Sequence, residues 1–167
     1  MINSSILIGA LPESRWEECR DLRLEGLREE PLAFGSSYEE EQLLTEKDWR
    51  ERIHNAIFAL DDNIVVGMVV IMDHTHTKSK HVANIFGVYV RASHRGKGVG
   101  YQLIEQAIKK LKESGHIRKI SLTVNTVQNS AVALYKKFGF EEAGILKKEL
   151  FYEGKYYDEL IMELLLG

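Results

Sequence analysis

Residues 88–100 read Val-Tyr-Val-Arg-Ala-Ser-His-Arg-Gly-Lys-Gly-Val-Gly, and this stretch decides the fold prediction. It begins in a run rich in β-branched and aromatic residues, 82–90, which predicts a strand. It ends where apolar residues start to recur at helical spacing, over residues 101–112. Three glycines therefore lie between a strand and the first turn of a helix. Unpaired backbone N–H groups and the positive end of the helix dipole meet there, so the turn is suited to hold a phosphate group.

Two other phosphate-binding loops do not fit the spacing of this turn. A P-loop would end in Gly-Lys-Ser/Thr, and no such ending is present. The dinucleotide fingerprint would place its third glycine at position 101, which is Tyr101. It would also need an acidic residue at the end of a following strand about 20 residues on, and none stands there. A purely structural role for the three glycines remains the alternative at this point.

The rest of the chain predicts a mixed α/β protein with the element order β-α-α-β-β-β-α-β-α-β-β. Proline, glycine and capping residues mark the element ends, and two short polar turns indicate hairpins. The second helix is expected to open after Gly35, where Ser36 and Ser37 each have a glutamate three residues on. The other predicted elements are strands at 5–10, 55–60, 64–72, 117–124, 146–152 and 156–165, a helix between Pro12 and Pro31, and a helix at 129–138.

Composition sets limits on the class of protein. A chain of 167 residues with 44% hydrophobic and 28% charged residues predicts one globular domain over residues 1–167. The net charge of −3 gives no basic footprint for nucleic acid. No apolar run reaches the roughly 20 residues of a membrane span, and the first residues do not resemble a signal peptide. With the lone cysteine, Cys19, these features predict a cytoplasmic protein without a membrane or nucleic-acid partner.

Two segments together resemble a known family. The spacing Arg95-x-x-Gly98-x-Gly100 after Val88-Tyr89-Val90 resembles the acyl-CoA signature of the GNAT superfamily of N-acyltransferases. Downstream, Asn129-Ser130-Ala131-x-x-Leu134-Tyr135-x-x-Phe138-Gly139-Phe140 is similar to the second family segment. The element order also matches, so the resemblance covers nearly the whole chain. It implies a three-layer fold with a mixed, mostly antiparallel seven-stranded sheet, in which the fourth and fifth strands splay apart.

The resemblance implies acetyl-CoA as cosubstrate and assigns its binding residues. The backbone of Val88 and Val90 would pair with the pantetheine arm, although core burial of these side chains is an equally simple interpretation. Asn129 would meet the cofactor, and helix capping alone would also explain it. The pyrophosphate would be bound by the turn residues Arg95, Gly96, Lys97, Gly98, Val99 and Gly100, through their amides and the Arg95 and Lys97 charges.

Tyr135 is the residue that the resemblance assigns as general acid. Its phenol would protonate the leaving thiolate, which suits a group that stays protonated at neutral pH. Its position on the apolar face of its helix also fits a plain core aromatic. The implied mechanism is direct attack of a neutral amine on the thioester. Cys19 supports this because it lies on the apolar stripe of the first helix, which indicates packing rather than nucleophilic catalysis.

The acceptor side is less defined. A base is needed to take the proton of the ammonium group, and the fourth strand carries no carboxylate. We consider Asp158 as the base because it shares parity with the residues of the last strand that are expected to face inward. The alternative is an aspartate that faces solvent. Phe34, Tyr38 and Asn84 are the candidate substrate-binding residues. The acidic residues 39–41 would suit a cationic amine, and capping of a helix explains them too. His74, His76 and His81 lie in a polar connection without metal-site spacing, so no metal is predicted.

These inferences predict an N-acetyltransferase that moves acetyl from acetyl-CoA to a primary amine on a small molecule or a protein. The alternative is an acyl-CoA-binding sensor or regulatory module without turnover. The sequence is also compatible with a homodimer formed through an exposed edge or a swapped last strand.

Overall fold

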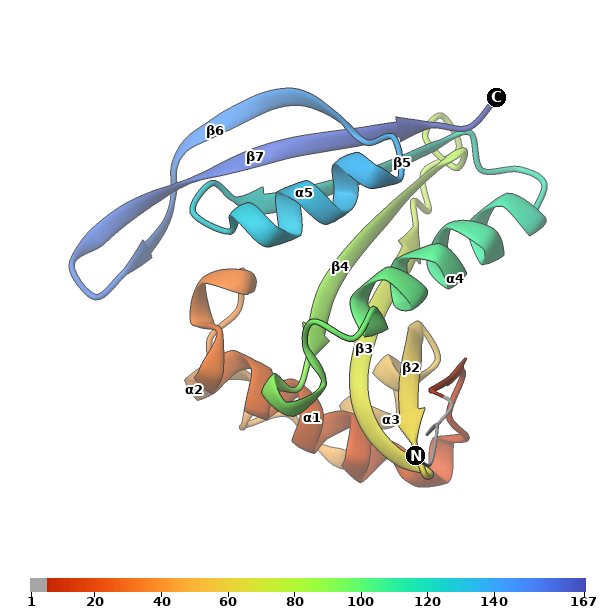
Figure 1. The fold of residues 1–167 in the computed structure, drawn as a ribbon, viewed down its shortest axis with the longest axis vertical. Coiled ribbons are helices and arrows are strands. Elements are labelled where there is room, and N and C mark those ends of the chain that lie inside the picture. The colour runs from red at the N-terminus through yellow and green to blue at the C-terminus, as the bar shows by residue number, and fades with distance from the viewer. Residues whose placement is uncertain (1–5) are drawn as a thin grey trace. The chain divides into compact units, whose positions relative to one another are not determined.

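The computed structural model describes residues 6–167, which form two compact units (Figure 1). The first unit comprises the chain up to Ile71 together with Gly87–Ala107, and the second comprises Met72–Phe86 and Ile108–Gly167. Ser5, the start of the first predicted strand, lies outside the described residues. The single domain expected over residues 1–167 stays a prediction.

The elements follow one another in an order close to the predicted one. The strands are β1 (Leu7–Gly9), β2 (Ala56–Asp61), β3 (Ile64–Asp73), β4 (Val82–Val90), β5 (Lys119–Asn125), β6 (Glu141–Tyr152) and β7 (Lys155–Leu165). The α-helices are α1 (Trp16–Glu29), α2 (Tyr38–Glu41), α3 (Glu46–Ile53), α4 (Val99–Glu113) and α5 (Asn129–Lys137). Short 3-10 turns are η1 (Glu13–Arg15), η2 (Pro31–Ala33) and η3 (Ala92–His94).

The sheet confirms the predicted fold class. The strands hydrogen-bond in the order β1-β2-β3-β4-β5-β7-β6. The pairs β1 with β2, β2 with β3, β5 with β7 and β6 with β7 are antiparallel. The parallel pairing of β4 with β5 covers three residue pairs at the start of each strand, from Val82 opposite Lys119 to Asn84 opposite Ser121. The fold is therefore a mixed α/β fold with a mostly antiparallel seven-stranded sheet.

Two-residue turns close both predicted hairpins. Asp62 and Asn63 join β2 to β3 with φ of 47° and 66°, and Glu153 and Gly154 join β6 to β7 with φ of 46° and 77°. Two consecutive positive φ values are the mark of a type I′ turn, whose twist matches that of antiparallel strands. Aspartate, asparagine and glycine tolerate this conformation best, which is why the turns could be read from the sequence.

The second predicted helix is two helices in the structure. Ser37 and Glu40 form a capping box before α2, and Thr45 and Asp48 form another before α3. Each box satisfies unpaired N–H groups at the start of a helix, so the chain restarts after a single turn. The expected helix start after Gly35 is confirmed at Ser37. The predicted order has one helix here instead of two, because the second box, Thr45-x-x-Asp48, was not recognised.

Each unit has an apolar interior of its own. In the first, Tyr89 of β4 belongs to a cluster of buried residues from α1, α3, β2, β3 and the end of η2, which includes Cys19, Leu22, Phe34, Ile53, Phe58 and Met68. In the second, the buried side chains of β5 and β7 lie opposite one another, as Leu122 does with Met162 and Val124 with Leu160. No helix within residues 6–167 has the length and apolar character to span a bilayer.

Candidate active site

The glycine turn lies in the first unit, between β4 and α4, as predicted. Gly96 and Gly98 have φ of 71° and 79°, in the left-handed region that favours glycine. A Cβ built on either residue would meet no described atom within 4 Å. The backbone of the turn is therefore open on the side where side chains would otherwise stand, and a ligand can approach it closely.

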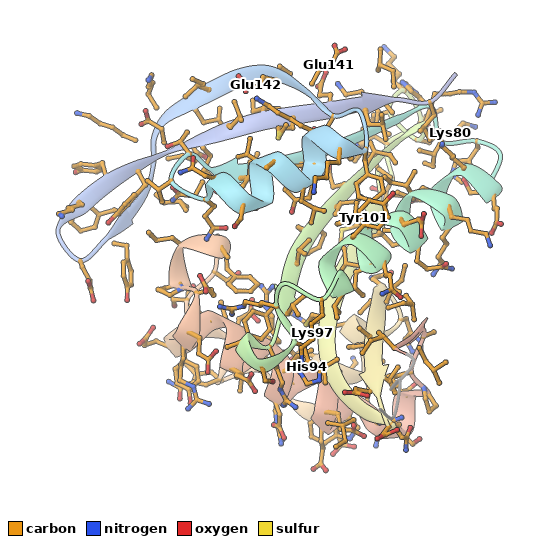
Figure 2. The ribbon with its side chains drawn as sticks, in the orientation of Figure 1. Lys80, His94, Lys97, Tyr101, Glu141 and Glu142 are labelled. Atoms are coloured by element: carbon orange, nitrogen blue, oxygen red, sulfur yellow. The ribbon has the colours of Figure 1, made fainter. Side chains whose placement is uncertain are left out.

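The two cationic side chains of the turn differ in their surroundings. Arg95 donates from Nε to the Val90 carbonyl oxygen (2.9 Å) and from Nη1 to Glu30 Oε1 (2.9 Å), so its charge is already paired with the C-cap residue of α1. Lys97, labelled in Figure 2, forms no ion pair with a described residue. Lys97 is accordingly the side chain of the turn whose charge is available to an anion.

His94 ties the start of the turn to the β2–β3 hairpin. Its Nε2 lies 3.0 Å from Asp61 Oδ2, and its Nδ1 lies 2.8 Å from Ser93 Oγ. Arg15 in turn holds the hairpin through the side chain and carbonyl oxygen of Asn63. Sequence reasoning missed this anchor because His94 and Asp61 are 33 residues apart and no short spacing connects them.

Carboxylates of α1 hold the end of β4 in place. The Tyr89 hydroxyl donates to Glu29 Oε2 (2.7 Å) and contacts Glu25 Oε1 (3.1 Å), and Arg91 Nε donates to Glu25. Burial of the Tyr89 phenol raises its pKa, and the two neighbouring carboxylates raise it further. Tyr89 is therefore a protonated, fixed donor that packs β4 against α1.

Val88 and Val90 alternate with the buried Tyr89 along β4. Both valines are half-buried, so part of each side chain packs into the protein. Val99, the first residue of α4, is buried in the core. Packing thus accounts for these three side chains, and any cofactor contact they make would use the backbone.

In the second unit, α5 carries the other predicted donor-side residues. Asn129 is exposed and is the first helical residue, while Gln128 occupies the N-cap without a side-chain hydrogen bond. The interpretation of Asn129 as a capping residue was therefore wrong. The nearby turn is built by Asn125, whose Oδ1 accepts from the Val127 N–H (3.1 Å).

Tyr135 is buried on the inner face of α5. Its ring lies 5.8 Å from that of Phe140, and 6% of the residue is exposed. Burial in this apolar surrounding raises the pKa of the phenol to about 12. The group therefore keeps its proton across the neutral range, as a proton donor must.

Asp158 lies in an irregular part of the β6–β7 hairpin. Its Oδ1 accepts from the Lys148 N–H (2.8 Å) and its Oδ2 pairs with Lys147 Nζ (3.0 Å). Lys148 has a positive φ of 55°, and the β6–β7 register shifts between Leu146 and Leu150. The hydrogen bond from the Lys148 backbone and then that from Lys147 lower the pKa of Asp158. These contacts favour a role in shaping the hairpin over one as a base.

The acceptor-side candidates fall into both units. Phe34 and Tyr38, in the first unit, each lie under an arginine of α1, with Arg23 4.4 Å and Arg28 4.8 Å from the ring centres. Asn84, in the second unit, has Nδ2 3.1 Å from His74 Nε2. Among residues 6–167, no group of three histidine, cysteine or acidic side chains is arranged to hold a metal.

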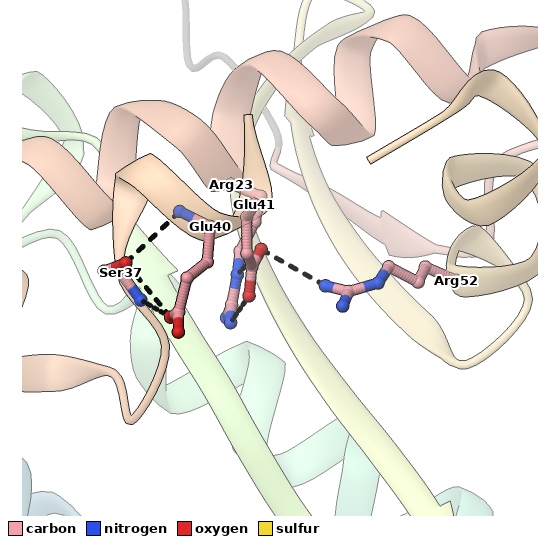
Figure 3. Close-up of polar contacts among 5 residues, drawn as sticks. All are labelled: Arg23, Ser37, Glu40, Glu41 and Arg52. Atoms are coloured by element: carbon pink, nitrogen blue, oxygen red, sulfur yellow. Dashed lines mark hydrogen bonds and ion pairs between the residues drawn. The ribbon is translucent and has the colours of Figure 1, made fainter. Parts of the chain in front are cut away.

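A buried ion pair joins α1 to α2 beside Phe34 and was not foreseen as a site. Arg23 donates from Nε and Nη2 to the two oxygens of Glu41 (2.9 and 2.7 Å), and Arg52 of α3 contacts the same carboxylate (3.1 Å; Figure 3). Burial works to raise the pKa of Glu41, but the two arginines and Ser36 outweigh it and hold the pKa below its usual range. The signal of this ion pair in the sequence was an arginine, Arg23, on the apolar stripe of the first helix.

Comparison with known proteins identifies the family. A model of the Acetyltransferase (GNAT) family matches residues 16–140. An L-amino acid N-acetyltransferase of Escherichia coli (strain K12) is 31% identical over 119 residues, which cover 68% of this chain and 73% of that protein. A spermidine N(1)-acetyltransferase of Vibrio cholerae is 31% identical over 101 residues, or 60% of this chain and 57% of that protein.

Solved structures agree on the fold. A GNAT-family acetyltransferase from Streptococcus pneumoniae aligns with a TM-score of 0.87 at 24% identity, over 97% of this chain and 100% of that one. A GNAT-superfamily phosphinothricin acetyltransferase from Sinorhizobium meliloti, solved with acetyl-CoA, aligns with a TM-score of 0.79 at 20% identity, over 97% and 89% of the two chains. Family model, relatives and fold coincide, so this chain belongs to the acetyltransferase (GNAT) family.

Proposed function

We propose that the protein transfers the acetyl group of acetyl-CoA to a primary amine by direct attack of the amine on the thioester. The glycine turn after β4 is the observation that supports the use of acetyl-CoA as the acetyl donor. Its backbone is open at Gly96 and Gly98, and Lys97 has no ion-pair partner among the described residues. Open backbone N–H groups at a helix N-terminus and an unmatched positive charge suit a pyrophosphate.

The remaining donor contacts are assigned by family resemblance. The backbones of Val88 and Val90 would hold the pantetheine arm, the amides of residues 95–100 would bind the pyrophosphate, and Asn129 would meet the cofactor. Arg95 contributes less charge than its sequence position suggested, because Glu30 already pairs with it. Its side chain instead holds the turn to the end of β4, where it donates to Val90.

The direct mechanism needs a proton donor and no protein nucleophile. Tyr135 is the proposed acid for the leaving thiolate, since its pKa of about 12 keeps it protonated. Cys19 is 2% exposed, and burial raises the pKa of its thiol to about 11, so it stays a neutral thiol in the core. We propose that water, rather than Asp158, removes the proton from the attacking ammonium, because two donors already occupy the Asp158 carboxylate.

Turnover tests the function directly. The purified protein is incubated with acetyl-CoA and a panel of polyamines, L-amino acids, amino acid amides and peptides with free N-termini, and release of CoA thiol is followed. We expect thiol release that depends on one class of amine, with the acetylated amine identified by mass spectrometry. Tight acetyl-CoA binding with no release across the panel would instead indicate a sensor module.

The glycine turn supplies a sharper prediction through a matched pair of variants. Gly98 and Gly115 both have a left-handed φ, 79° and 75°, and open space where a Cβ would stand. Alanine at either position is expected to cost about 1–2 kcal/mol of stability, because an L-residue is strained there. Of the two variants, only Gly98→Ala is expected to raise the KM for acetyl-CoA, by about 10- to 100-fold. This factor corresponds to the loss of one hydrogen bond to a charged group, here the pyrophosphate.

Steady-state kinetics and thermal unfolding of the two variants separate strain from binding. Gly115 follows α4 and lies outside the turn, so it reports strain alone. Equal KM values for acetyl-CoA in the two variants would contradict the assignment of the turn to the pyrophosphate.

A further inference from the structure

The buried guanidinium of Arg23 has one nitrogen that the protein leaves unused. A guanidinium presents five N–H donors in a fixed fork, and Glu41 takes Nε and Nη2 of Arg23. Nη1 donates to no described residue. Among residues 6–167, the side-chain nitrogens that are both fully enclosed and unpaired are Trp49 Nε1 and Asn125 Nδ2. Nη1 of Arg23 is not one of them, so it retains contact with solvent. Since 91% of the side chain is buried, its orientation is fixed before any ligand arrives.

The absence of a side chain at Gly87 of β4 lets Nη1 pack close to this strand. A Cβ on Gly87 would lie 2.9 Å from Nη1 and 3.2 Å from Val70 Cγ2. Gly87 also has a left-handed φ of 61°, so a side chain is disfavoured there by the backbone as well as by space. The free nitrogen therefore faces the strand to which the proposed function assigns the acyl donor.

The charge around Arg23 favours an anion. Arg23 and Arg52 share one carboxylate, that of Glu41, so the three residues carry a net charge of +1, part of which Asp48 offsets at Arg52 (Figure 3). The neighbouring Glu40 adds no contact to this cluster, because it is held in the capping box with Ser37. The Phe34 ring lies 4.4 Å from the guanidinium carbon and supplies an apolar wall. A planar cation with a free edge beside an apolar wall is suited to a carboxylate next to a hydrocarbon side chain.

We propose that Arg23 Nη1 binds the α-carboxylate of the acceptor, and that the acceptor is a free amino acid. This inference rests on the proposed function, because it names the substrate of the same reaction. The guanidinium holds the carboxylate while the α-amino group attacks the thioester. Arg23 is thus a specificity-determining residue, and Glu41 positions it by holding its other edge.

The test compares L-amino acids with their own carboxamides, matched side chain by side chain and at one pH. An amide retains the amine and the side chain but lacks the negative charge. The ratio of kcat/KM for acid over amide is measured in the wild-type protein, in Arg23→Lys and in Arg28→Lys. Because each ratio is taken within one variant, any loss of folded protein or of general turnover cancels.

Arg23→Lys is expected to lower the acid-over-amide ratio about 10- to 100-fold, since the compact ammonium of lysine stays beside Glu41 and lacks the separate nitrogen that Nη1 provides at the other edge of the guanidinium. Arg28→Lys is the matched control, because Arg28 is an exposed arginine of the same helix, and its ratio should stay at the wild-type value. An Arg23→Lys ratio within about twofold of wild type, or wild-type turnover of amides without turnover of acids, would refute the carboxylate site and leave the proposed function standing. Absence of turnover with every amine would refute the proposed function and this site together.

Discussion

Replacing Tyr135 with phenylalanine is expected to lower kcat by about 10²- to 10³-fold, within the range that a positioned acid contributes. The phenol is the group proposed to protonate the leaving thiolate, and its buried position holds its pKa near 12. Phenylalanine fills the same volume beside Phe140, so the packing at 5.8 Å between the rings should persist. The KM for acetyl-CoA is expected to change little, because the loss falls on the chemical step.

Two measurements make this test specific. Thermal unfolding of Tyr135→Phe should match that of the wild-type protein, since no hydrogen bond of the described residues is lost with the hydroxyl. Tyr156→Phe serves as the control for removal of a phenol, because Tyr156 is 63% exposed at the tip of the β6–β7 hairpin and pairs only with the ring of Phe151 and the Lys148 ammonium among the described residues. Full turnover of Tyr135→Phe would remove Tyr135 from the mechanism.

The pH dependence gives a second view of the same residue. A general acid is active while it is protonated, and activity is lost as the pH rises through its pKa. Because burial raises the pKa of Tyr135 to about 12, its deprotonation should leave the rate unchanged through the neutral and mildly alkaline range. An alkaline loss of rate near pH 10 that disappears in Tyr135→Phe would show a phenol with an ordinary pKa instead.

Local signals predicted much of the fold. The strand ending at Val90, the glycine turn and the helix after it were found because β-branched runs, glycines and helical spacing are properties of neighbouring residues. The type I′ turns at Asp62–Asn63 and Glu153–Gly154 were visible for the same reason. The helix boundaries were less accurate: the predicted second helix is divided, and Asn129 lies inside α5 rather than at its cap.

The electrostatics of the candidate site could not be predicted because its partners are distant in sequence. Arg95 looked like a free cation, but Glu30 neutralises it from 65 positions away. Asp158 could be interpreted as an inward-facing base or as a solvent-facing aspartate, and neither interpretation included its bonds to Lys147 and Lys148 in an irregular hairpin. Only folding decides which charges meet, and so only the structure distinguishes Lys97, which has no ion pair among the described residues, from Arg95.

Removing the Glu41 carboxylate is expected to have the largest effect on stability. In Glu41→Ala the buried Arg23 loses the acceptor of its Nε and Nη2 donors, and breaking a buried pair in this way costs about 3–5 kcal/mol. Urea unfolding monitored by the fluorescence of the two tryptophans, Trp16 of α1 and the buried Trp49 of α3, reports the free energy of unfolding. The matched control is the double variant Arg23→Met/Glu41→Met, which removes both charges and fills the space with apolar atoms.

The double variant should recover most of the stability lost in Glu41→Ala, because replacing a buried ion pair by hydrophobic residues is often neutral or stabilising. Recovery would show that the loss in Glu41→Ala comes from the uncompensated guanidinium and the space that alanine leaves, rather than from the missing attraction of the ion pair. If the double variant is as unstable as Glu41→Ala, the ion pair itself, with its bidentate geometry between α1 and α2, is what holds the two helices together.

The same carboxylate makes stability depend on pH with a definite sign. The pKa of Glu41 is depressed in the folded protein, against the effect of burial, by Arg23, Arg52 and Ser36. A group with a depressed folded pKa binds more protons in the unfolded state between the two pKa values, so its stabilisation is complete above the unfolded value of about 4.3 and is lost as the pH falls through the folded value. Between pH 7 and pH 3 the wild-type protein should therefore lose more unfolding free energy than the Arg23→Met/Glu41→Met variant. Parallel acid-unfolding curves for the two proteins would mean that Glu41 titrates alike in the folded and unfolded chains, which the short bonds to Arg23 argue against.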